Sequence, residues 1–145
     1  MINHLTILLI GFSVFALVIL LGAYWFFLPD MRKSQPGKLA CSALIVCLIL
    51  LQLAHYHHFA FNTDLLSYRV YGVLLMFAPP TFYFFTRVVI LPDPDYPWWH
   101  LLHLIPLGIS FLVPLTHLPL FAFSIGSLYV CLLYTSDAAD EWLRG

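Results

Sequence analysis

Residues 5–28 form a continuous stretch without a single Asp, Glu, Lys or Arg. A helix rises about 1.5 Å per residue, so a stretch of this length covers a hydrocarbon core of roughly 30 Å with some allowance for tilt. The four residues before it include no Lys or Arg, whereas a cleaved signal peptide begins with a basic segment. The stretch therefore predicts a transmembrane helix that stays attached to the chain.

Four further apolar stretches follow, separated by short connections that are rich in proline, glycine or charge. The predicted helices cover residues 39–58, 70–90, 99–113 and 118–130. The last of these helices has only about thirteen residues before Cys131, or some 20 Å of helix, so this span is predicted to be truncated. In the predicted helix at residues 70–90, the tripeptide Ala78-Pro79-Pro80 lacks two backbone N–H donors and predicts a kink near the middle of the membrane.

The composition also places the chain in a bilayer. Hydrophobic residues make up 62% of the sequence and charged residues only 9%, which leaves too little polar surface to cover a soluble core. A net charge of −1 argues against a nucleic-acid surface, because phosphate binding requires clustered Lys and Arg. We therefore expect an all-α membrane protein, a helical bundle of about four full transmembrane helices plus a truncated fifth.

The distribution of basic residues predicts the orientation. The connection at residues 32–38 contains three of the six Lys and Arg residues, and Arg87 begins the next connection on the same side. The connection on the opposite side contains only Arg69. Because cytoplasmic loops carry an excess of basic residues, the chain is predicted to be a multi-pass protein of the inner (cytoplasmic) membrane with its N-terminus outside.

The end of the chain has an unusual sequence. Residues 131–141, which read CLLYTSDAADE, resemble a translated transposase adapter of the kind used in sequencing libraries. We interpret residues 131–145 as a foreign tail and residues 1–130 as the transmembrane region of a gene fragment. A genuine loop after a short helix is the alternative interpretation.

Two pairs of histidines have a spacing that could bring two imidazoles to a metal. His55 and His58 share one helix face, with His57 beside them. They are weak candidates for a metal or haem site, because no nearby carboxylate or cysteine completes the ligand set. Solvated histidines at a membrane interface are the preferred interpretation. His100 and His103 repeat the spacing beside two tryptophans, where the interfacial interpretation applies with more force.

Motifs for other chemistry are absent from the sequence before residue 131. Cys41, Cys47 and Cys131 lack a metal or disulfide spacing and are interpreted as buried thiols. No glycine-rich phosphate loop, nucleophile–base pairing or catalytic carboxylate pair occurs. The charged residues lie at the ends of predicted spans, which disfavours an ion pump. We therefore expect no enzymatic activity, no catalytic residues and no cofactor.

Two segments carry a resemblance to a known family. Residues 71–87 end in the motif P-x-x-F/Y-x-Y/F-x-R, from Pro80 to Arg87, and residues 98–106 follow W-x-x-L-L-H-x-x-P, from Trp98 to Pro106. Together with the surrounding spans they resemble the multi-span N-terminal region of membrane-bound AraC-type transcriptional regulators. The resemblance covers residues 1–130. It implies a membrane-embedded sensor or anchor whose DNA-binding helix-turn-helix domain is missing from this chain.

In such a regulator, a signal in or near the bilayer changes helix packing and thereby the pairing of cytosolic DNA-binding modules. A coupling of about 1–3 kcal/mol suffices. The implied partners are the lipid bilayer, a second copy in a homodimer, and DNA through a C-terminal domain absent here. Two alternatives remain open: the membrane input region of a sensor kinase or other signalling protein, and a small transporter or scaffold. The sequence that follows residue 130 in the intact gene distinguishes them.

Overall fold

The computed structural model describes residues 2–27, 35–90 and 102–144, and in this part of the chain it contains five α-helices and no strand. The prediction of an all-α fold is confirmed. The helices are α1 (Ile2–Phe27), α2 (Gln35–Phe61), α3 (Arg69–Ile90), α4 (Ile105–Leu112) and α5 (Leu118–Arg144). Short 3₁₀-helices precede α3 (Leu65–Ser67) and α5 (Leu115–His117).

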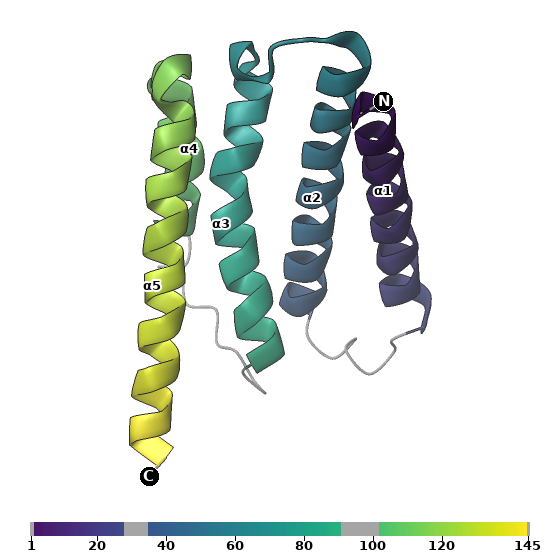
Figure 1. Cartoon of the computed structure of the whole chain (residues 1–145). Helices are drawn as coiled ribbons and strands as arrows, with labels where there is room; N and C mark the ends of the chain where they lie inside the picture. The colour runs from purple at the N-terminus through teal and green to yellow at the C-terminus, as the bar shows by residue number, and fades with distance from the viewer. Residues whose placement is uncertain (1, 28–34, 91–101, 145) are drawn as a thin grey trace.

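Helices α1, α2, α3 and α5 lie side by side in one row, and α4 lies behind this row (Figure 1). Successive helices run in opposite directions, with α1 packed on α2, α2 on α3, and both α4 and α5 on α3. The N-terminus, the α2–α3 connection and the α4–α5 connection lie at the upper end of the bundle in Figure 1, and the C-terminus lies at the lower end. Helix α3 is therefore the element on which most of the packing depends.

Three helices are long and apolar enough to cross a membrane, by length and composition. These segments are His4–Phe26, Gly37–Phe61 and Leu115–Thr135, with 23, 25 and 21 residues. Among the described residues α3 does not meet the same criterion, although its 22 residues rise about 33 Å. The membrane character is thus supported by three helices, and the prediction of four full spans is not confirmed.

The fourth predicted span, residues 99–113, differs most from the structure. Helix α4 has eight residues, and the apolar helical segment that contains it runs only over Leu102–Leu112. Such a segment rises about 16 Å, which is too short to cross a bilayer. Pro106 lies in the first turn, where a missing N–H is tolerated, and Val113 is extended ahead of Pro114. The two prolines therefore delimit the helix; residues 99–101 lie outside the described residues.

The fifth predicted span, residues 118–130, is longer than expected. Helix α5 continues to Arg144, through the residues interpreted as a foreign tail. Residues 131–144 contain no Gly or Pro and several good helix formers, which extend the helix.

Cys41 and Cys47 are buried as predicted, but Cys131 is exposed beside exposed Val130 and Leu132, so the interpretation as a buried thiol is wrong for this residue.

Helix α3 runs without interruption through Pro79 and Pro80. The buried Thr81 hydroxyl donates to the carbonyl oxygens of Phe77 at 3.1 Å and Ala78 at 2.8 Å. The carbonyls that lose a donor to Pro79 and Pro80 are those of Leu75 and Met76, so the Thr81 bonds add to the turn around the prolines and do not replace the missing ones. The helix nevertheless continues through the site of the predicted kink.

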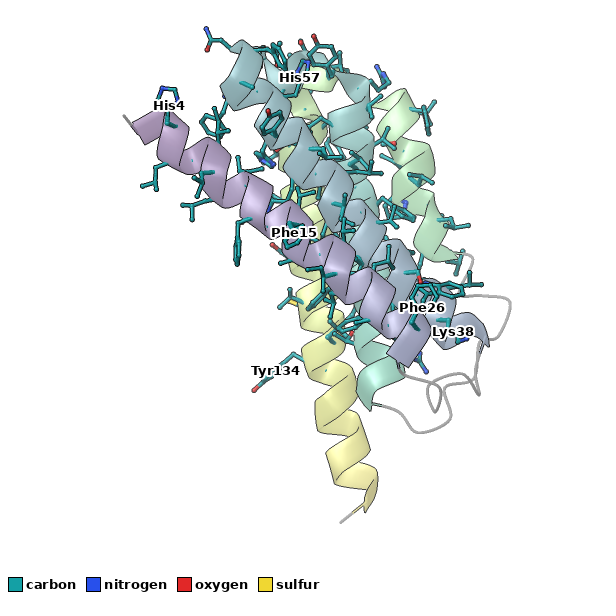
Figure 2. All side chains as sticks on the ribbon, turned by 90° about the vertical axis from the view of Figure 1, so that its right-hand side faces the viewer. His4, Phe15, Phe26, Lys38, His57 and Tyr134 are labelled. Carbon is teal, nitrogen blue, oxygen red and sulfur yellow. The ribbon has the colours of Figure 1, made fainter. Side chains whose placement is uncertain are left out.

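Most apolar side chains of α1 face outward. Phe15 and Phe26 are 63% and 84% exposed and project from the helix (Figure 2). The buried apolar cluster instead lies between α3 and α5, where Met76, Leu118 and Ala122 pack together. An apolar face of this extent is stable against lipid and unfavourable in water.

Gly72 allows α3 and α5 to approach closely. A Cβ atom added at Gly72 would lie 2.5 Å from Cδ1 of Leu118 and 3.3 Å from its Cβ and Cγ. Leu118 is only 1% exposed, so its side chain has little free space to move into. Small residues at helix contacts are a common solution for packing in membranes.

Arg69, the first residue of α3, fixes the end of α4. Its Nη1 atom donates to the carbonyl oxygens of Ser110, Phe111 and Val113 at 2.9, 3.0 and 3.3 Å. The last carbonyls of a helix lack intrahelical partners and carry the negative end of its dipole. A cation at this place therefore stabilises a helix too short to be stable alone.

Candidate functional site

The first histidine of the predicted metal pair, His55, joins α2 to α3. Its Nδ1 atom lies 2.7 Å from the Leu51 carbonyl oxygen, and its Nε2 atom lies 3.4 Å from the Tyr71 hydroxyl. Because a carbonyl can only accept, Nδ1 carries the proton and Nε2 accepts from Tyr71. The rings of His55 and Tyr71 also meet edge to face, with centroids 5.7 Å apart. Both ring nitrogens of His55 therefore have a protein partner.

His58, the second histidine of the pair, closes the turn after α2 together with His57. Nδ1 of His58 bonds to the carbonyl oxygen of Thr63, and Nδ1 of His57 lies 2.9 Å from the Oγ1 atom of Thr63. Asn62 within this turn has a φ of 53°. No group of three or more His, Cys, Asp or Glu side chains that could hold a metal ion occurs among the described residues. The described contacts of these histidines are those of helix-end and turn residues.

A second polar group joins α3, the segment before α4, and α5. Nδ1 of His103 lies 2.7 Å from the Tyr129 hydroxyl, and the His103 ring lies 4.6 Å from that of Tyr83. The rings of Tyr83 and Tyr129 are 5.7 Å apart. Nη1 of Arg87 donates to the Tyr83 hydroxyl at 3.2 Å. We call Tyr83, Arg87, His103 and Tyr129 the aromatic–arginine cluster.

Arg87 gives this cluster a permanent positive charge. Its guanidinium carbon lies 5.9 Å from the centre of the Tyr83 ring, within the range of a cation–π interaction. Its Nε atom is buried and has no hydrogen-bond acceptor among the described residues. A guanidinium cannot lose its proton in a protein, and its fork of donors suits carboxylate or phosphate oxygens. The cluster is therefore suited to holding an anion.

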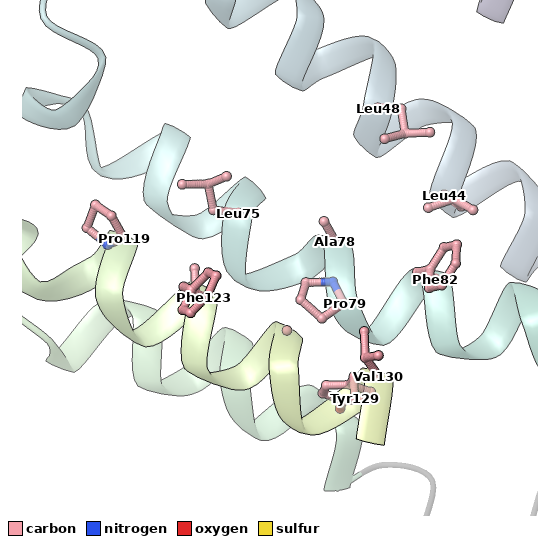
Figure 3. Close-up of a pocket in the computed structure, with 12 residues that line it drawn as sticks. Leu44, Leu48, Leu75, Ala78, Pro79, Phe82, Pro119, Phe123, Tyr129 and Val130 are labelled. Carbon is pink, nitrogen blue, oxygen red and sulfur yellow. The ribbon is translucent and has the colours of Figure 1, made fainter. Parts of the chain in front are cut away.

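An apolar groove lies next to the cluster, with a volume of about 650 Å³. Helix α3 forms its floor and α2 and α5 its walls (Figure 3). The floor consists of side chains that recur on one face of α3, among them Ala78, Pro79 and Phe82. Gly126 and Tyr129 of α5 also line the space. The groove exists because Ala78 and Gly126 are small and leave space between the helices. Tyr129 belongs to both the groove and the cluster.

Sequence reasoning assigned His103 to a membrane interface and did not find its partners. Tyr129 lies 26 residues further along the chain, and no local spacing connects the two. A signal was present in the two family motifs, because Tyr83 and Arg87 belong to one and His103 to the other. The structure brings these motif residues together. His100 lies outside the described residues.

Comparisons of this chain with family models, curated proteins and solved structures found no match.

Proposed function

We propose that this chain is the membrane-embedded sensor or anchor region of an AraC-type transcriptional regulator. The observation that carries the proposal is the contact between the two motifs of the resemblance. Arg87 and Tyr83 at the end of the first motif meet His103 of the second. Contact between Tyr83, Arg87 and His103 gives a physical reason why the two motifs would occur together in one family.

The cluster connects the apolar groove to the last helix. Tyr129 lines the groove and accepts or donates a hydrogen bond with His103, so a change in groove packing acts directly on this bond. Helix α5 carries that change along its length toward the residues that follow position 130 in the intact protein. A coupling of about 1–3 kcal/mol between groove and C-terminus is enough to alter the pairing of attached modules.

The proposed orientation in the inner membrane, with the N-terminus outside, rests on the excess of basic residues in the connections at residues 32–38 and 87–99. In Figure 1 the N-terminus lies at the upper end of the bundle and the C-terminus at the lower end. With the N-terminus outside, an odd total number of spans in the intact protein places a DNA-reading domain in the cytoplasm. In this proposal the lipid bilayer and a second copy are partners of these residues, and DNA contacts belong to a C-terminal domain outside them.

Sequencing the native gene across the codon for Val130 tests the proposal. We expect an open reading frame that continues through further membrane spans, to an odd total, and ends in a cytosolic domain of about a hundred residues with two helix-turn-helix units. A sensor-kinase module in that place, or a stop codon directly after Val130, would contradict it. A second measurement is DNA binding by the intact product, whose affinity should fall steeply with salt because Lys and Arg displace counterions from phosphates.

A further inference from the structure

The groove between α2, α3 and α5 has the properties of a binding site for one hydrocarbon chain. Its lining residues on α5 extend from Pro119 to Val130, which spans about 16 Å of helix. Apart from the Tyr129 hydroxyl, which already bonds to His103, the side chains that line it are apolar. The volume of about 650 Å³ is typical of a pocket for a single small ligand.

The groove is open along its rim rather than enclosed by protein. Phe123 and Val130 line it and are 75% and 62% exposed. Both belong to a helix segment that is long and apolar enough to cross a membrane. A ligand would therefore enter from the hydrocarbon core of the bilayer.

Arg87 lies beyond one end of the groove. It follows Phe82, which lines that end, by five residues, or about 7.5 Å along α3. The Tyr129 and Tyr83 rings connect the groove to the guanidinium, whose buried Nε atom lacks an acceptor among the described residues. An unfilled donor of this kind is costly in an apolar environment. An anionic head group at this end would supply acceptor oxygens and a compensating charge.

We propose that the groove binds a long-chain fatty acid, with the acyl chain between α2 and α5 and the carboxylate at Arg87. A single-chain amphiphile fits because the groove is one apolar space that extends about 16 Å along α5 with a volume of about 650 Å³. A planar guanidinium pairs well with a carboxylate. This site is independent of the regulator proposal, since it concerns only described residues of this chain.

The test uses the full chain in phosphatidylcholine nanodiscs with a diazirine-bearing palmitic acid. After illumination, peptide mass spectrometry locates the label. We expect peptides that contain Phe123 and Val130 to be labelled well above the outward face of α1, which is equally apolar and exposed. Equal labelling of the groove peptides and of the outward face of α1 would mean ordinary contact with the surrounding lipid and would overturn the proposal.

Competition identifies the head group. Palmitic acid should displace the probe about tenfold better than hexadecanol, since a charge-assisted pair is worth roughly that factor. In the Arg87→Gln variant, palmitic acid and hexadecanol should compete equally. The control variant Lys38→Gln should keep the preference for the acid, because the Lys38 ammonium group lies over the ring of Trp25, a residue of α1, and not at the groove. Equal competition in the unmodified chain, or equally strong competition by phosphatidylglycerol, contradicts a fatty-acid site.

Steric variants identify the groove. Gly126→Leu places a side chain in the space and should remove the groove label, whereas Ser127→Leu, one residue along at an exposed position, should not. Leu48→Trp fills the groove from α2 and serves if Gly126→Leu does not fold by circular dichroism. Undiminished labelling in a folded groove-filling variant would overturn the assignment.

Discussion

The close approach of α3 and α5 at Gly72 makes a quantitative prediction. In Gly72→Ala the new methyl would lie 2.5 Å from Cδ1 of Leu118 and 3.3 Å from its Cβ and Cγ. Leu118 is 1% exposed, so relief requires a shift of the helices or a poor rotamer. Overpacking of this kind costs about 1–3 kcal/mol. Replacing a helical Gly by Ala alone gains up to about 1 kcal/mol.

The matched control is Gly22→Ala, because nothing lies within 4 Å of a Cβ atom at Gly22. The control should be neutral or slightly stabilised, and Gly72→Ala should be less stable than the control by about 1–3 kcal/mol. Reversible unfolding in mixed micelles, followed by circular dichroism, measures both values. In a double-mutant cycle, Leu118→Ala should suppress the cost of Gly72→Ala. Equal stability of Gly72→Ala and Gly22→Ala would refute the reasoning.

Three further predictions concern two polar contacts and the orientation of the chain. Arg69→Gln removes the cation from three carbonyl oxygens and should destabilise α4 by about 1.5–3 kcal/mol, seen as faster hydrogen exchange in α4 while α1 is unaffected; unchanged exchange would argue against this role. Tyr129→Phe removes the 2.7 Å bond to His103 and should cost about 0.5–1.5 kcal/mol of stability, whereas an unaltered unfolding midpoint would mean that the bond contributes nothing. Cysteine labelling from outside should reach a probe at Thr63 and miss one at Ser34, a residue outside the described part of the chain; the reverse result would invert the orientation.

Helix positions were largely predictable from the sequence, because long uncharged stretches have few other stable structures in lipid. The first three predicted spans, residues 5–28, 39–58 and 70–90, correspond to α1, α2 and α3 within a few residues. The fourth differs because hydrophobicity alone does not reveal that the α-helix starts at Ile105, just before Pro106, or that Val113 before Pro114 is extended. Helix α5 covers the fifth predicted span and continues beyond residue 130, because residues 131–144 contain no Gly or Pro.

The sequence by itself determined that this chain forms long apolar helices with their charges at the ends, since that outcome depends on composition and local spacing. Only the tertiary structure decided which helix faces meet. It gave His55 and His58 partners in α3 and in their own turn, brought His103 to Tyr129 across 26 residues, and set Gly72 against Leu118. In a membrane protein nearly every helix face is apolar, so the hydrophobic pattern does not distinguish a packed face from a lipid-facing one. Small residues and a few hydrogen bonds make that choice, and they act between segments far apart in the chain.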